Sequence, residues 1–254
     1  MTTSSTRPAA RAARLVAVVG LAVATAGCAA SAPEGQLIAD PYESLNRDIH
    51  EFNKGWDQVL IRPAAFIYKE ATPTLFQFLV GNAVDHITLP LQVVNHTLQL
   101  DFEDAAATAG RFVVNTVAGA GGLLDPATEF GLPERPTDTG VTLAEWGAQE
   151  GPYVVLPFFG PFTGRDAVGR VADFALDPFN AINIPGGAAV AAARVVAPAV
   201  DARAANFEII DDALYASDDS YVTVRTGYVL SRRRFVAGET GVGALPDIYG
   251  ETEQ

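Results

Sequence analysis

Apolar side chains recur every three or four positions along most of this chain, the spacing that places them on one face of an α-helix. The clearest such stretch runs from Ser44 to Leu60. Two others run from Val200 to Leu214 and from Tyr221 to Tyr228. A fourth begins at Asp101, because that aspartate and Asp104 are side chains that a helix N-terminus favours. The pattern predicts an all-α fold.

Thr72 and Pro73 predict the start of a further helix, with the threonine as its cap and the proline at its first position. Further along, His86 and His96 lie on either side of Pro90, and each could line a polar patch. The spacing of the three histidines in the chain does not match that of a metal site, so no metal is expected.

One short, very apolar segment interrupts the helical pattern. Residues 151–166 read GPYVVLPFFGPFTGRD, and the glycines and prolines in this run exclude a long helix. The segment is either a buried strand or hairpin that fills the core, or a mobile apolar hairpin that contacts lipid. The sequence leaves both open. A second stretch rich in glycine and proline covers residues 119–136.

The first 27 residues have the parts of a secretory signal peptide. Arg7, Arg11 and Arg14 precede a short apolar run, which ends in small residues directly before Cys28, the single cysteine of the chain. A cysteine at this place is the lipid acceptor of a bacterial lipoprotein. We therefore expect S-diacylglycerol and an N-acyl chain on Cys28, which together anchor a protein stably, and no other cofactor. An ordinary signal peptide that happens to contain a cysteine is the alternative.

These features divide the chain into four parts. We expect a signal peptide at 1–27, a lipidated linker at 28–39, one helical domain at 40–236, and a disordered tail, rich in glycine and acidic residues, at 237–254. Ala29 follows the cysteine, in place of the aspartate that commonly retains lipoproteins at the inner membrane. An outer-membrane destination, facing the periplasm, is therefore expected.

Charge and hydropathy narrow the possible partners. The chain carries a net charge of −13, and residues 1–27 hold arginines but no acid, so the remainder is more acidic still. This argues against nucleic acid as a partner and against docking on anionic lipid through charge. Yet 49% of the residues are hydrophobic. The longest apolar run after the signal, Ala181–Val200, is too interrupted by proline and glycine for a membrane span, and a buried or interfacial helix is expected there.

The chain lacks the short motifs of common catalytic sites. It has no G-x-S-x-G nucleophile elbow, no H-E-x-x-H pair and no phosphate-binding loop with lysine. We therefore expect a protein that is not an enzyme.

Four collinear stretches carry a resemblance to a known family. They are DPYESLNRDIHEFNKGWDQVLIRP, RFVVNTVAGAGGLLD, GVTLAEWGAQEGPYVVLPFFGPFTGRDAVG and, with the helix at 203–212, SDDSYVTVRTGYVLSRR. Together they resemble the MlaA (VacJ) family of outer-membrane lipoproteins. The resemblance extends from about Asp40 to Arg234, nearly the whole mature chain.

The resemblance implies both a fold and a function. The fold would be a ring of amphipathic helices lying in the membrane around a central amphipathic channel, with a short non-helical apolar hairpin segment. The function would be to take phospholipids that have strayed into the outer leaflet and pass them to a soluble periplasmic phospholipid carrier (an MlaC-like protein), which maintains lipid asymmetry. A trimeric porin or a related barrel would hold the ring in the bilayer.

The resemblance also implies which residues form the site. The candidates for the lipid path or the hairpin are Gly121, Gly122, Tyr153, Val155, Leu156, Pro157, Phe158 and Phe159. We further hypothesise that arginines guide the phosphate of the head group, since a guanidinium binds phosphate through two parallel hydrogen bonds. These candidates are Arg47, Arg62, Arg111 and Arg165. The alternative for these arginines is ion pairing with the plentiful acidic side chains.

Two other classes of function stay open. A structural lipoprotein could tether envelope complexes through its acidic surface without moving lipid. A lipid hydrolase would instead release lysophospholipid or free fatty acid from labelled phospholipid.

Overall fold

The computed structural model describes residues 37–181 and 187–239. Cys28, the signal peptide and nearly all of the predicted linker and tail lie outside these residues. The longer helices are α2 (Glu43–Trp56), α3 (Arg62–Ala71), α4 (Thr74–Leu98), α5 (Phe102–Val117), α8 (Gly164–Leu176), α9 (Gly187–Ala205) and α11 (Ser220–Val236). The shorter ones are α6 (Pro126–Glu129), α7 (Thr139–Glu145) and α10 (Phe207–Asp211). There are also two strands, β1 (Tyr153–Leu156) and β2 (Gly160–Thr163), a 3₁₀ turn, η2 (Pro178–Ala181), and two π-helical turns, η1 (Asp57–Ile61) and η3 (Asp212–Ala216).

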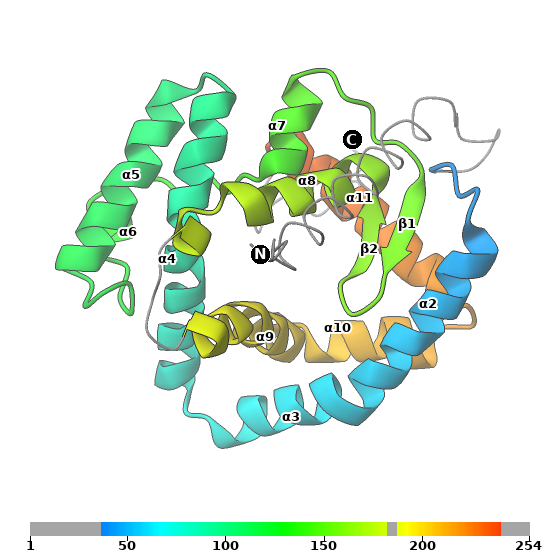
Figure 1. Cartoon of the computed structure of the whole chain (residues 1–254). Helices are drawn as coiled ribbons and strands as arrows, with labels where there is room; N and C mark the ends of the chain where they lie inside the picture. Colours follow the sequence, from blue (N-terminus) through cyan, green and yellow to red (C-terminus); the bar gives the residue numbers. More distant parts are fainter. Residues whose placement is uncertain (1–36, 182–186, 240–254) are drawn as a thin grey trace, which may run out of the picture.

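The helices follow one another around the periphery of the fold (Figure 1). The chain runs from α2 through α3 to α4, and α5 then packs antiparallel beside α4. The later helix α9 packs against both α3 and α4, while α8 packs against α7 and the hairpin. No helix in the described part of the chain is long and apolar enough to cross a membrane.

The predicted helix from Ser44 to Leu60 is the first half of a longer helical rod. One π-helical turn, Asp57–Ile61, joins α2 to α3 without leaving helical backbone angles. Asp57 accepts hydrogen bonds from Arg203 Nε at 3.0 Å and from the Tyr215 hydroxyl at 2.8 Å. The π turn therefore coincides with the point where buried polar groups tie this rod to the later helices.

Two predicted helices differ from the structure. The prediction that Thr72 caps a helix with Pro73 at its first position is wrong, because Thr72 ends α3 in an extended conformation and α4 begins at Thr74. Helix α4 also continues through Pro90 to Leu98. The predicted helix from Val200 to Leu214 is interrupted at Asn206, which separates α9 from α10. The Asp101 prediction is confirmed, since its side chain accepts from Asp104 N at 3.0 Å.

The apolar segment after Gly151 forms an antiparallel β-hairpin, so the expected all-α fold is corrected to a mostly helical fold with one hairpin. Tyr153 pairs with Thr163, and Leu156 pairs with Gly160 at the turn. Alternate residues of β1 are buried, Tyr153 completely and Val155 nearly so. The hairpin interpretation of the sequence is thus confirmed, and its mobility stays a prediction.

The distribution of polar and apolar side chains is inverted in much of the fold. The buried apolar cluster is small, and its members are Ile38, Tyr153, Val155, Tyr221 and Val229. Many large apolar side chains are instead exposed, such as Val59 at 79%, Val117 at 80% and Phe174 at 74%. Conversely, polar and charged side chains are buried, among them Asn46, His86, Asn95, Arg111, Asp166 and Arg203. Large apolar side chains exposed in this number are typical of a protein that contacts lipid or another protein.

Candidate functional site

Two asparagines of α2 hold the outer edge of the hairpin. Asn46 Nδ2 donates to the carbonyl of Tyr153 at 3.1 Å, and its Oδ1 accepts from Val155 N at 2.9 Å. Two helical turns later, Asn53 Nδ2 donates to the carbonyl of Leu156 at 3.0 Å, and its Oδ1 accepts from Phe158 N at 2.7 Å. Each side-chain amide thereby takes the place of a neighbouring strand, which satisfies the edge of β1.

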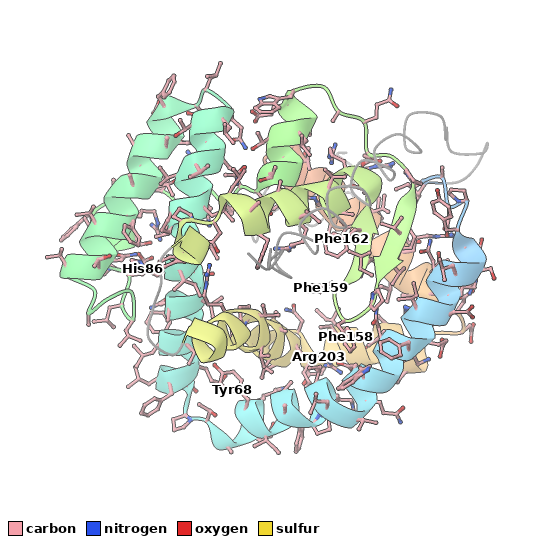
Figure 2. All side chains as sticks on the ribbon, in the orientation of Figure 1. Tyr68, His86, Phe158, Phe159, Phe162 and Arg203 are labelled. Carbon is pink, nitrogen blue, oxygen red and sulfur yellow. The ribbon has the colours of Figure 1, made fainter. Side chains whose placement is uncertain are left out.

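The turn of the hairpin presents two phenylalanines. Phe158 has a φ of +68°, a left-handed conformation that is costly for a bulky side chain. Its ring packs edge-on against Phe52 at 5.2 Å and Trp56 at 5.3 Å between ring centroids. Phe158 is 66% exposed and Phe159 is 58% exposed. In Figure 2, Phe158 lies beside α2, whereas Phe159 lies nearer the centre of the molecule. The two apolar side chains of the turn therefore lie on different sides of it.

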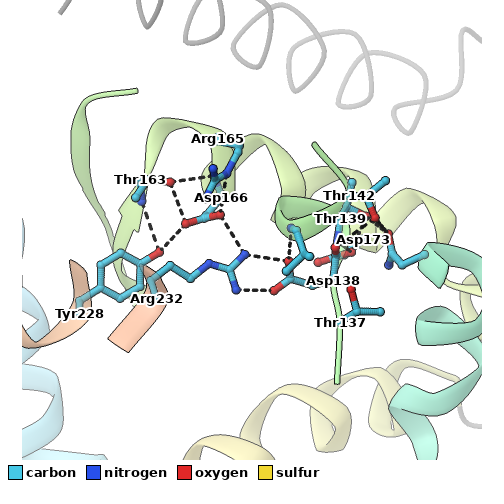
Figure 3. Close-up of polar contacts among 12 residues, drawn as sticks. Thr137, Asp138, Thr139, Thr142, Thr163, Arg165, Asp166, Asp173, Tyr228 and Arg232 are labelled. Carbon is cyan, nitrogen blue, oxygen red and sulfur yellow. Dashed lines mark hydrogen bonds and ion pairs between the residues drawn. The ribbon is translucent and has the colours of Figure 1, made fainter. Parts of the chain in front are cut away.

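A buried polar network fixes the base of the hairpin (Figure 3). Asp166 accepts from the Thr163 hydroxyl at 2.7 Å, from the Tyr228 hydroxyl at 3.1 Å and from Arg232 Nη2 at 2.9 Å. Arg232 also forms a two-bond ion pair with Asp138, both distances being 2.8 Å. Burial by itself would raise the pKa of Asp166. The hydrogen bond and the positive charge of Arg232, together with the hydrogen bond from the Thr163 hydroxyl, instead bring this pKa below its ordinary value. The end of β2 is therefore tied to α7, α8 and α11.

On the other side of the fold, α4, α5 and the segment that follows α5 line a partly open polar cavity of about 100 Å³. Its lining residues are Asn82, Asp85, His86, Leu89, Gln92, Thr108, Arg111, Asn115, Asp125, Glu134, Arg135 and Pro136. His86 stacks on Phe112 with 4.8 Å between ring centroids and forms a 3.1 Å hydrogen bond with the Thr116 hydroxyl. The sequence interpretation that His86 could line a polar patch is therefore confirmed.

Ion pairs and backbone turns build one wall of this cavity. Arg111, 4% exposed, pairs with both Asp125 and Glu134 at 2.9 Å. Burial would raise the pKa of Asp125, yet hydrogen bonds from Thr128, Asn115 and Arg111 hold it below its ordinary value. Gly122 lies so close to His86 that a Cβ on it would approach the imidazole Cγ to 2.2 Å.

The structure places the predicted site residues in two groups. Gly121 and Gly122 follow the end of α5 and Arg111 lies on that helix, while the predicted residues of 153–159 form the hairpin. In Figure 1, α5 and the hairpin are on opposite sides of the ribbon. Asp85 and Thr108, which also line the cavity, were not among the predicted residues. The sequence around each of them has the pattern of an ordinary amphipathic helix and gives no sign of a site. Only the packing of α4 against α5 brings the two residues to the same cavity.

All four predicted head-group arginines form ion pairs. Arg47 pairs with Glu43 and Asp219, Arg62 with Asp211, Arg111 as above, and Arg165 with Asp166 at 3.5 Å. Their contact with phosphate stays a prediction, and the alternative of pairing with acidic side chains describes the contacts observed.

One group of possible metal ligands occurs among the described residues. His96, Asp101 and Asp104 each offer one ligand atom, and these atoms lie within 4.8 Å of one another. Both carboxylates already have protein partners, since Asp101 caps α5 and Asp104 pairs with Arg135 at 3.3 Å. Contacts within the protein therefore account for the positions of these two carboxylates.

Taken together, these features define a helical protein that turns apolar side chains outward, keeps polar groups inside and carries an apolar hairpin. The family model of the MlaA lipoprotein matches residues 38–235. This chain belongs to the MlaA lipoprotein family.

Individual relatives agree with this assignment. The intermembrane phospholipid transport system lipoprotein MlaA of Escherichia coli K12 is 31% identical over 215 residues, 83% of either chain. An uncharacterized protein of Rickettsia felis is 39% identical over 142 residues, and the chain spans 57% of the length of that relative. A solved structure described as the structural basis for maintenance of bacterial outer membrane lipid asymmetry matches with a TM-score of 0.64 and 30% identity, over 78% of this chain and 99% of that one.

Proposed function

We propose that this chain is the outer-membrane lipoprotein of an intermembrane phospholipid transport system. In this proposal it removes mislocalised phospholipids from the outer leaflet and passes them to a periplasmic phospholipid carrier. The helices lie in the bilayer as a ring around an amphipathic channel, held by a trimeric porin or a related barrel. The acyl chains on Cys28 direct the protein to the outer membrane and add to its attachment.

The observation that carries the proposal is the inverted distribution of side chains. Large apolar residues are exposed along α2, α3, α4 and α5, for example Phe52, Phe66, Phe76 and Val113. In water such a surface is unfavourable, whereas acyl chains of a bilayer cover it at no cost. Buried asparagines, arginines and aspartates on the inside supply the polar contacts that a phospholipid head group needs to pass a hydrocarbon layer.

The hairpin is suited to control the lipid path. Its turn residues Phe158 and Phe159 are apolar and exposed, while its base is fixed by the Asp166 network. Two asparagine side chains are the polar contacts that hold its outer edge to α2. In the proposal, loss of the outer contact at Asn53 lets the turn move while the base stays in place.

Locking the hairpin tests transport against the alternative of a structural tether. We would replace Phe52 and Phe158, whose rings touch, by cysteine and join them with a short bifunctional maleimide. Cells lacking their own copy and expressing the double variant are then assayed for phospholipid at the cell surface with a membrane-impermeant amine reagent. Transport predicts surface phospholipid that rises after crosslinking and stays low in untreated cells.

The matched controls are the two single-cysteine variants treated with the same reagent. A crosslinked double variant that keeps surface phospholipid as low as these controls would contradict a moving hairpin and favour the tether. Incubation of the purified protein with labelled phospholipid addresses the hydrolase alternative, since transport predicts unchanged lipid.

A further inference from the structure

Three buried polar atoms without hydrogen-bond partners lie in side chains that line the cavity between α4 and α5. They are His86 Nδ1, Thr108 Oγ1 and Arg111 Nε. The three residues are 7%, 1% and 4% exposed. Buried polar groups without partners are costly, and several of them around one polar cavity indicate a site that receives a polar ligand.

The hydrogen bonds around His86 determine which ring nitrogen is the free acceptor. The Thr116 hydroxyl donates its one hydrogen to the carbonyl of Phe112 at 2.6 Å. Its oxygen can therefore only accept from His86 Nε2, which must carry the proton. Nδ1 is then a lone-pair acceptor. Burial lowers the pKa of His86, which keeps the ring neutral and Nδ1 unprotonated at neutral pH.

Asp85 gives the cavity an unpaired negative charge. Within the described residues its carboxylate has no hydrogen bond or ion pair, whereas Asp125 and Glu134 share Arg111 and the cavity's second arginine, Arg135, pairs with Asp104. Asp85 is exposed as a residue, but partial desolvation raises the pKa of its carboxyl group, as do the neighbouring carboxylates, Glu134 first among them, while Arg111 lowers it. A cation beside Asp85 would relieve both effects.

We propose that this cavity binds the primary ammonium of a phospholipid head group, such as that of phosphatidylethanolamine. An ammonium carries three N–H donors, and three residues that line the cavity each have an acceptor without a hydrogen-bond partner: the Asp85 carboxylate, His86 Nδ1 and Thr108 Oγ1. Arg111, whose Nε has no hydrogen-bond partner, lines the same cavity and can donate to the adjoining phosphate. The inference rests on the proposed phospholipid transport and adds head-group selectivity to it.

The same chemistry disfavours other head groups. A quaternary ammonium has no N–H to donate, so it would leave His86 Nδ1 and Thr108 Oγ1 without partners. A head group that carries no cation would bring the charge of its phosphate toward Asp85 without compensation. The cavity therefore selects by hydrogen bonding and charge together.

Binding to the full-length lipoprotein in detergent micelles tests the selectivity. Short-chain phosphatidylethanolamine, phosphatidylcholine and phosphatidylglycerol with identical acyl chains are titrated and followed by isothermal titration calorimetry. We expect phosphatidylethanolamine to bind about tenfold more tightly than the other two lipids. About a tenfold difference in affinity is the effect expected from one hydrogen bond to a charged group. Asp85→Asn should remove this preference and leave the other affinities unchanged.

Two further variants separate recognition from folding. Asp48→Asn makes the same change at an exposed position of α2 outside the cavity, so it should bind like the wild type. Thr108→Val keeps the side-chain shape, and it should weaken phosphatidylethanolamine binding by about threefold while the melting temperature stays equal or rises.

Each outcome has a defined meaning. Equal binding of all three lipids by the wild type, or an unchanged preference in Asp85→Asn, overturns the inference while phospholipid transport stands. Absence of binding by every phospholipid would count against the proposed function itself. Free ethanolamine is the last ligand to be titrated. If it binds more weakly than phosphatidylethanolamine, the result supports a head-group site. If it binds equally tightly, the cavity is a site for a free amine, and the proposal of a phospholipid ligand is overturned.

Discussion

Asn53 spans the turn of the hairpin, accepting from Phe158 N at 2.7 Å and donating to the carbonyl of Leu156 at 3.0 Å. The two ends of this contact are 105 residues apart in the chain. The turn holds Phe158 in a left-handed conformation, so the hydrogen bonds of Asn53 offset part of a backbone strain. The position of the apolar turn thus depends on one polar side chain of α2.

Asn53→Ala should release the turn while the fold remains. We expect a loss of about 1 kcal/mol in unfolding free energy, because the contact is only partly buried. Hydrogen exchange at the Phe158 amide, followed by mass spectrometry, should become at least about tenfold faster. Asn206→Ala, which also removes an exposed asparagine-to-backbone bond, is the control. An unchanged Phe158 exchange rate would show that Asn53 does not hold the turn.

Asn46→Ala should destabilise the whole domain more strongly. Its side chain is 2% exposed and satisfies both Tyr153 O and Val155 N, which would be left buried without partners. We expect a loss of about 3 kcal/mol in unfolding free energy, measured by urea denaturation. A loss no larger than that of Asn53→Ala would contradict the assigned role in the core.

Gly122→Ala should be far more harmful than Gly121→Ala. Both glycines have positive φ, but only at Gly122 would the new Cβ meet another side chain, 2.2 Å from His86 Cγ. A Cβ at Gly121 has nothing within 4 Å. Thermal unfolding should show a loss of about 1 kcal/mol for Gly121→Ala, from the backbone alone, and about 3 kcal/mol or more for Gly122→Ala. Equal losses would mean that the loop moves away from His86 freely.

Arg232→Ala should cost more stability than the same change at the next residue. Arg232 joins Asp138 and Asp166 and is 12% exposed in its side chain, so its removal leaves the buried Asp166 with only its longer ion pair to Arg165, at 3.5 Å, among the described residues. We expect a loss of about 3 kcal/mol or more. Arg233 pairs with Glu150 at the surface, with 42% of its side chain exposed, and Arg233→Ala should cost at most about 1 kcal/mol. Urea denaturation of both variants is the measurement.

Acid should weaken the fold through Asp166. Its pKa is lower in the folded than in the unfolded chain, so it contributes stability above its unfolded pKa of 3.8 and loses it as pH falls toward the folded value. The unfolding free energy of the wild type should therefore fall below about pH 4. In Asp166→Asn, which is less stable at pH 7, this part of the pH dependence should be absent. Parallel curves for the two proteins would exclude Asp166 as its source.

Much of the fold follows from local patterns in the sequence. The starts of α5 and α2, the non-helical character of 151–163 and the glycine-rich turn after α5 were all predicted from spacing, caps and breakers. Boundaries failed where distant packing takes over. The helix predicted to Leu60 continues into α3 through a π turn where Asp57 meets Arg203, and the helix predicted from Val200 to Leu214 is interrupted at Asn206.

The resemblance to the MlaA family could be recognised in the sequence because its motifs are long and ordered, and the comparisons confirm it. The motif residues Asn46 and Asn53 have their meaning only in space, where they bind the edge of β1. The sequence also could not show what the four predicted arginines bind. A guanidinium fits phosphate and carboxylate equally well, and which acidic side chain lies nearest depends on how the helices pack.

The order of residues alone determines most of the helical segments of this chain, its non-helical hairpin segment and the family it belongs to, because those properties depend on neighbours within a few positions or on long collinear motifs. The polar cavity depends instead on α4 and α5 lying side by side, which brings Asp85, His86, Thr108 and Arg111 together. The unpaired atoms of His86, Thr108 and Arg111 result from burial, and burial is a property of the assembled helices.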